Sequence, residues 1–234
     1  IVSTFMGAHD FPRELEREAC IDQVIDEMIP RVAAEDLAGF CDVFCDEGYY
    51  TVEQTRRILE AGIASGMAPK IHADQYSDMG GAGLAAELAV VSADHLNFTG
   101  PEGLRDMAEA GVVAVLMPLI DFAVQHPRPI RARDWIDAGL EIALGTDLCP
   151  GGYSVSMPLA IQFACRWNGL SPEEALMAAT AGSARACRLS DRGAIVPGAV
   201  ADLQVWDVPS LEDMVYRIGH NPVRTVIKNG KVVA

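Results

Sequence analysis

Short apolar runs alternate with amphipathic stretches along the chain from Ser3 to about Ser183. The apolar runs, each closed by a polar residue or a proline, predict β-strands, and the stretches between them predict helices. Successive runs end 21 to 37 residues apart, which is the length of one strand–helix step. Six strands are predicted, within residues 3–9, 41–47, 70–74, 90–95, 112–118 and 141–147.

The helix boundaries have local signals of their own. Thr51 with Gln54, and Ser171 with Glu174, predict capping boxes at two helix starts. Residues 10–38 form a longer acidic insertion that we expect to be helical. Helix C-caps are predicted just before the next apolar run, at glycines 66, 111 and 139.

Continuously apolar strands that alternate with helices are typical of a parallel sheet covered on both faces. No glycine-rich phosphate loop follows any of the strands, which disfavours a nucleotide-binding open sheet. A (β/α)8 barrel takes about 250 residues, so six of its units should span about 190. The pattern therefore predicts an α/β fold, an incomplete TIM-type barrel over residues 1–190 with about six of eight units, and we expect the missing units ahead of Ile1.

After Asp191 the pattern changes to strand-like alternation around the turn pair Asn229-Gly230, which predicts a hairpin. Residues 191–234 are therefore predicted to form part of a small β-subdomain.

Composition excludes several classes of protein. Lys and Arg number 18 against 33 Asp and Glu, a net charge of −15, and the cations are scattered, so neither nucleic acid nor an anionic membrane is an expected partner. No apolar run is long enough to cross a bilayer, and residues 1–10 lack the basic segment and the apolar stretch that are typical of a secretory signal. The six cysteines include no CxxC pair, which favours a reducing compartment. We predict a cytoplasmic protein with a small-molecule partner.

Three predicted strand ends carry groups that can bind a metal, namely His72, His95 and Asp147. In a parallel barrel such ends converge on one rim. One such residue alone is usually structural, but three on one rim favour a zinc or iron site. His9 ends the first strand and either contacts a substrate or is a partly buried turn residue.

Other candidates have competing interpretations. Asp74 and Gln75 either orient a ligand or start the next helix. His126 is predicted to lie in a surface loop. Cys149 has no basic neighbour in the sequence, so we expect a small buried side chain and not a reactive thiolate.

The segments STFMGAH, KIHADQ, SADHL, GTDLCPG, PGAVADLQVWD and VIKNGKVV resemble the imidazolonepropionases of the amidohydrolase superfamily, in register over nearly the whole chain. The resemblance implies metal-dependent hydrolysis of a cyclic amide C–N bond, in which imidazolone-5-propionate gives N-formimino-L-glutamate during histidine degradation. It also implies an anionic substrate and a homodimer.

The same resemblance implies a role for each residue that matches a family motif. His72 and Asp147 would bind one divalent metal, Zn or Fe, and Asp147 would also transfer the proton. His95 would steady the developing oxyanion. His9 and Gln75 would contact the substrate, and the loop with Cys149, Gly151 and Gly152 would close over its tail.

The chain departs from the family in three places. It contains no His-x-His pair, which completes the metal site in the family, and it has Gln75 where many members have Glu. Cys149-Pro150-Gly151-Gly152 replaces the common Asn-Pro-Gly-Ser/Thr. Two alternatives therefore remain: another amidohydrolase, such as a deaminase or another cyclic-amide hydrolase, or an inactive fragment that lacks its metal ligands.

Overall fold

A computed structural model describes residues 1–234. By its contacts the chain forms two compact units, one of Ile1–Ala114 with Ala138–Leu140, the other of Val115–Asp137 with Glu141–Ala234. Six strands follow one another in the main sheet in chain order, and the first four pair in parallel. They are β1 (Thr4–Ala8), β2 (Phe40–Cys45), β3 (Ala68–Ala73), β4 (Ser92–His95), β5 (Val113–Leu116) and β6 (Glu141–Leu144). The six predicted strands are confirmed.

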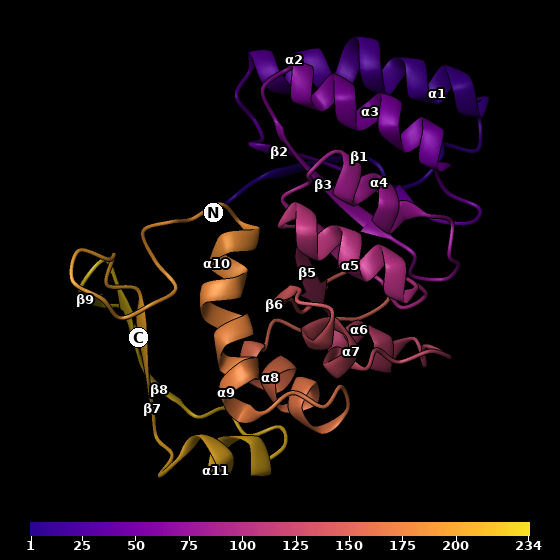
Figure 1. The fold of residues 1–234 in the computed structure, drawn as a ribbon. Helices are drawn as coiled ribbons and strands as arrows, with labels where there is room; N and C mark the ends of the chain where they lie inside the picture. The colour runs from indigo at the N-terminus through magenta and orange to yellow at the C-terminus, as the bar shows by residue number, and fades with distance from the viewer. The chain divides into compact units, whose positions relative to one another are not determined.

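The first unit packs its helices on the early strands. The insertion at residues 10–38 is helical as expected, and its helices lie beside α3 in Figure 1. Thr51 and Gln54 form the predicted capping box at the start of α3. The helices of this unit are α1 (Arg17–Gln23), the π-helix η1 (Val24–Met28), α2 (Ile29–Ala34), α3 (Val52–Ala64), α4 (Gly81–Glu87) and α5 (Pro101–Ala110).

The register of β2 and β3 separates two faces of the sheet. Cys41, Val43 and Cys45 are fully buried, and Gly62 of α3 packs against Cys41 so closely that an added Cβ would come within 2.7 Å of it. Because side chains alternate along a strand, Asp42 and Phe44 point to the opposite face. Phe44 pairs with His72, so these polar and aromatic groups share that opposite face.

In the second unit, one continuous helical segment packs on β6. It consists of α9 (Pro172–Met177), the π-helix η2 (Ala178–Gly182) and α10 (Ser183–Ala186), and it begins with the predicted capping box of Ser171 and Glu174. The other helices of the barrel region in this unit are α6 (Pro118–Ala123), α7 (Ala132–Asp137) and α8 (Met157–Arg166).

His126, which follows α6, corrects a prediction. It is only 5% exposed, although a surface position was expected. Its backbone N–H donates to the Asp121 carbonyl at 2.8 Å, and its Nδ1 accepts from the Arg128 N–H at 3.1 Å. The loop therefore folds back over its own histidine.

The tail forms a separate antiparallel sheet of β7 (Leu203–Trp206), β8 (Val223–Lys228) and β9 (Lys231–Val232). Asn229 and Gly230 both have positive φ, at 49° and 76°, as a tight hairpin turn requires, so the hairpin is confirmed. A short helix, α11 (Leu211–Tyr216), was not predicted. The division of the chain at residue 190 stays a prediction.

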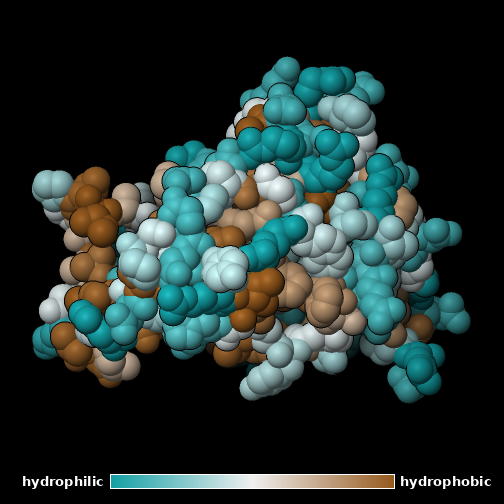
Figure 2. Space-filling view, turned by 90° about the horizontal axis from the view of Figure 1, so that it is seen from below, coloured by the Kyte–Doolittle hydropathy of each residue, from teal (hydrophilic) through white to brown (hydrophobic).

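Apolar side chains are exposed on this tail. In Figure 2 hydrophobic residues gather on the left of the picture, over the part of the molecule that carries β7–β9. They include Ile195, Val196, Val232 and Val233. None of the helices is both long and apolar enough to cross a membrane.

Candidate active site

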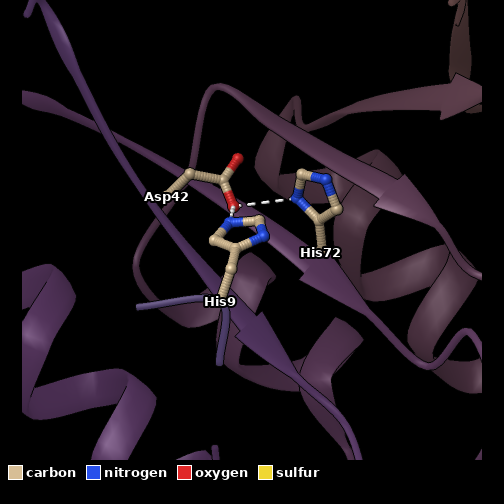
Figure 3. Close-up of side chains that lie close together, drawn as sticks. All are labelled: His9, Asp42 and His72. Carbon is tan, nitrogen blue, oxygen red and sulfur yellow. Dashed lines mark hydrogen bonds and ion pairs between the residues drawn. The ribbon is translucent and has the colours of Figure 1, made fainter. Parts of the chain in front are cut away.

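Three side chains from neighbouring strands meet on the polar face of the first unit. His9 follows β1 directly, Asp42 lies within β2 and His72 lies near the end of β3 (Figure 3). Oδ1 of Asp42 is 3.1 Å from Nε2 of His9 and 2.8 Å from Nδ1 of His72. The two imidazole rings stand edge to face, with their centroids 4.6 Å apart. One carboxylate oxygen therefore bonds both histidines.

Asp42 is 2% exposed, so its charge depends on protein partners and not on water. Burial alone would raise the pKa of this carboxyl. The charge and hydrogen bond of His72, followed by those of His9, outweigh burial and hold the pKa below its ordinary value. Asp42 is therefore an ionised carboxylate at neutral pH, shared by two imidazoles.

The chemistry of this group fits a metal site. Imidazole and carboxylate suit zinc or iron, and the three nearest ligand atoms lie within 4.8 Å of one another. However, two atoms bound at about 2.0–2.1 Å to one tetrahedral ion should lie about 3.3 Å apart. The 2.8 Å separation of His72 and Asp42 is shorter and is that of a charge-assisted hydrogen bond. Asp42 thus orients the His72 ring through Nδ1, and the other ring nitrogen, Nε2, is the one suited to a metal.

His95 joins the same group from β4. It pairs with Ala73 across the sheet, and its ring centroid is 5.1 Å from that of His72. Its side chain is buried, and its φ of 74°, followed by 63° at Leu96, turns the chain sharply at the strand end. Such strained backbone is frequent at functional sites. The structure therefore brings His9, His72 and His95 together.

Asp74 has a structural role. It is fully buried with a φ of 50°, and its carboxylate accepts from the Thr99 hydroxyl at 2.8 Å and from the N–H groups of Gly81 and Ala82 at 3.1 and 3.3 Å. Burial, only partly opposed by these bonds, raises its pKa. Of its two interpretations, the start of the next helix is the one that the contacts support. Gln75, the next residue, is also buried.

Asp147 and the loop after it belong to the second unit. Asp147 follows β6 with a φ of 47°. Cys149 and Gly152 exchange two backbone hydrogen bonds of 3.1 Å, which close a tight turn through Pro150 and Gly151. Cys149 is partly exposed, so the expectation of a buried side chain was wrong. The turn also lies close to α6, because a Cβ added to Gly152 would come within 2.9 Å of the Ile120 side chain.

Asp42 is the site residue that sequence reasoning missed. Its signal was an acid in the middle of a strand whose neighbours Cys41 and Val43 are apolar. A carboxylate at such a position must be paired once the strand is buried. Asp94 is also an acid within a strand; it pairs with His72 across the sheet, and its Oδ2 is 3.6 Å from His72 Nδ1.

Several known proteins are similar to this chain. It is 48% identical to an imidazolonepropionase of Brevibacillus brevis over all of its length and 56% of that protein. An imidazolonepropionase of Bacteroides fragilis is 45% identical over 98% of the chain and 56% of that protein. The chain thus spans little more than half the length of these relatives.

Solved structures share the fold at lower identity. A zinc-bound adenosine deaminase from Xanthomonas campestris superposes with a TM-score of 0.75 at 21% identity, over 97% of this chain and 59% of that one. The N-isopropylammelide isopropylaminohydrolase of Burkholderia multivorans gives 0.73 at 21% identity, over 97% and 62%. These matches support the TIM-type barrel class. Residues 26–234 match the sequence profile described as the Amidohydrolase family, and the chain belongs to that family.

Proposed function

We propose that this chain carries a large part of an imidazolonepropionase active site, which hydrolyses the cyclic amide C–N bond of imidazolone-5-propionate to N-formimino-L-glutamate. The observation that carries the proposal is the 48% identity over the whole chain, together with the cluster of His9, Asp42, His72 and His95 within one compact unit. Because the chain spans 56% of the relatives' length, the complete activity requires the rest of such a protein.

His72 and Asp147 are the residues that we assign to a divalent metal, zinc or iron. When bound, such an ion lowers the pKa of a water molecule from about 15.7 to about 7 and polarises a carbonyl. Imidazole and carboxylate are suitable donors for either ion, so the choice between them is not made by these residues.

The remaining steps belong to side chains. Asp147 takes a proton from the attacking water and passes it to the leaving ring nitrogen, which is general acid–base work worth about 10²- to 10⁴-fold in rate. His95 faces the carbonyl oxygen as negative charge develops on it. His9 and Gln75 contact the ring, and the turn at Cys149, Gly151 and Gly152 covers its propionate tail.

The propionate group is an anion, and the chain has a net charge of −15. Binding of this group therefore needs a cation close to it. We assign that cation to the part of the relatives that the chain does not span. A homodimer in the cytoplasm is the assembly that we propose for the complete protein.

A chimera tests this function. The part of the Brevibacillus brevis protein that the match leaves uncovered is joined ahead of Ile1, and the product is assayed with imidazolone-5-propionate, adenosine, cytosine and hydantoin. We expect turnover of the first substrate, and Asp147→Asn should lower kcat by at least about 10²-fold. Asp137→Asn, an exposed carboxylate in α7, is the matched control and should leave kcat unchanged. Turnover of another substrate alone, or full activity of Asp147→Asn, contradicts the proposal.

The 234-residue chain by itself tests the remaining alternative, which is an inactive fragment that lacks its metal ligands. Metal analysis after dialysis against zinc or iron measures whether it retains a stoichiometric ion. If neither this chain nor the chimera binds metal or turns over substrate, the chain is a fragment without catalytic function.

A further inference from the structure

We propose that Asp42 is a positioning residue that sets His9 and His72 in opposite tautomers, so that His72 presents an unprotonated Nε2 and His9 an unprotonated Nδ1. The part of this inference that concerns a metal rests on the proposed function. The part that concerns the two tautomers rests only on the three side chains of Figure 3.

The hydrogen-bonding capacity of a carboxylate determines where the ring protons lie. An ionised carboxylate only accepts hydrogen bonds, so each ring nitrogen that contacts it must carry the proton. Oδ1 of Asp42 contacts Nδ1 of His72 and Nε2 of His9. A charged imidazolium carries a proton on both nitrogens, whereas a neutral imidazole has one proton and its second nitrogen keeps a lone pair. In the neutral rings the two contacts therefore require the Nδ1–H form of His72 and the Nε2–H form of His9.

The surroundings prevent water from replacing these bonds. The side chain of Asp42 is 2% exposed, and those of His72 and His9 are 13% and 22% exposed. Rotation of either ring would leave a buried carboxylate oxygen with one donor fewer, which is costly in a protein interior. Oδ2 of Asp94, 3.6 Å from His72 Nδ1, adds a second negative charge on the same side of that ring. Both carboxylates favour the proton at Nδ1.

The two histidines therefore have different roles. His72 offers the lone pair of Nε2 to a metal, with Asp42 behind it in the arrangement that orients metal-binding histidines and raises their basicity. His9 offers the lone pair of Nδ1 as an acceptor, so it suits a ring N–H of a cyclic amide and not a ring carbonyl. Asp42 touches neither metal nor substrate in this scheme.

The tautomers can be measured without any activity. The metal-free 234-residue chain is labelled with ¹⁵N-histidine, and a long-range ¹H–¹⁵N correlation at mildly alkaline pH distinguishes protonated from unprotonated ring nitrogens. His72→Gln and His9→Gln assign the signals. We expect Nδ1–H for His72 and Nε2–H for His9. A proton on Nε2 of His72, or the same tautomer at both residues, overturns the proposal.

Metal affinity provides the second readout. Asp42→Asn should weaken Zn²⁺ or Co²⁺ binding by about 10- to 100-fold, since removal of a group that supports a ligand has effects of that order. Asp46→Asn is the matched control: it is a buried carboxylate that follows the same strand, and it accepts from the Glu47 and Tyr76 N–H groups and from the Ser77 hydroxyl. Its metal affinity should stay within about threefold of the parent.

These outcomes separate the inference from the proposed function. If Asp42→Asn binds metal as tightly as the parent, Asp42 does not position His72. If Asp42→Asn does not fold, the tautomers of the unsubstituted chain still decide. If the tautomers are as expected and the chimera hydrolyses no imidazolone-propionate, the inference stands and the proposed function fails.

Discussion

The ends of β3 and β6 show how one chain holds two similar strand ends in different ways. Each continues into an aspartate with a left-handed backbone, Asp74 with a φ of 50° and Asp147 with a φ of 47°. At β3 the aspartate is fully buried and its carboxylate binds the next helix. At β6 the support comes from residues almost 40 positions later, where Ser183 Oγ donates to the Leu144 carbonyl at 2.9 Å.

The two strand ends differ in how far away in the sequence the residues lie that stabilise them. The β3 end is completed by residues 74–99, within one strand–helix–strand step. The β6 end depends on the close approach of η2, because an added Cβ on Gly182 would collide with the Ile142 carbonyl oxygen. A substitution in η2 should therefore disturb β6, although the two segments are far apart in the sequence.

The largest expected effect is that of Gly182→Ala. The new methyl group must displace backbone of β6, which should lower the free energy of unfolding by about 3 kcal/mol. Urea unfolding followed by circular dichroism measures the loss. Gly83→Ala, in α4, meets no atom within 4 Å and should stabilise the protein by up to about 1 kcal/mol. Equal stability of the two variants would contradict the dependence of β6 on η2.

Asp74→Asn comes next. An amide places its NH₂ against donors such as the Thr99 hydroxyl and the Gly81 N–H, so about 2 kcal/mol of the free energy of unfolding should be lost. Asp137→Asn, at an exposed carboxylate in α7, is the control and should change the free energy of unfolding by less than about 0.5 kcal/mol. The same urea assay compares them, and an equal loss in the two variants would contradict the structural role of Asp74.

Thiol reactivity measures the difference in burial between the cysteines of the two units. In the first unit Cys20, Cys41 and Cys45 are buried, whereas Cys149 and Cys187 of the second are partly exposed. Burial raises the pKa of Cys41 to about 12 and that of Cys45 to about 11, which suppresses their reactive thiolates. Brief iodoacetamide treatment and peptide mass spectrometry should find Cys41 and Cys45 labelled at least about 100-fold more slowly than Cys187. Labelling of Cys41 at the rate of Cys187 would show that the first unit opens readily.

Features with local causes were predictable. The capping box at Thr51 and the hairpin at Asn229-Gly230 depend on residues within four positions of one another. The helix α11 also begins with a local signal, since the Ser210 hydroxyl accepts from the Asp213 N–H at 3.2 Å. It was missed because a helix of six residues is marginal by itself. Gln162 of α8 stabilises it by donating to the Met214 carbonyl at 2.9 Å.

The candidate site also contains residues that were predictable from the sequence and residues that were not. His9, His72 and His95 were predictable as neighbours, because parallel strands place their carboxyl ends on one side. Asp42 was not, since its importance depends on strand register and on which nitrogen of each ring faces it. His126 and Cys149 were assigned the wrong exposure because loop burial depends on how the loop folds back, which apolar periodicity does not encode.

The amino-acid sequence by itself determined the order of strands and helices, the helix starts, the tail hairpin and the three histidines that meet on one side of the sheet. These features follow from side-chain periodicity and from short-range hydrogen bonding, both of which are written in consecutive residues. Only the tertiary structure decided that Asp42 serves two histidines and that Asp74 holds a helix start. Both decisions depend on contacts between residues about 7 to 33 positions apart, and the energy of a buried charge is known only when its partners are in place.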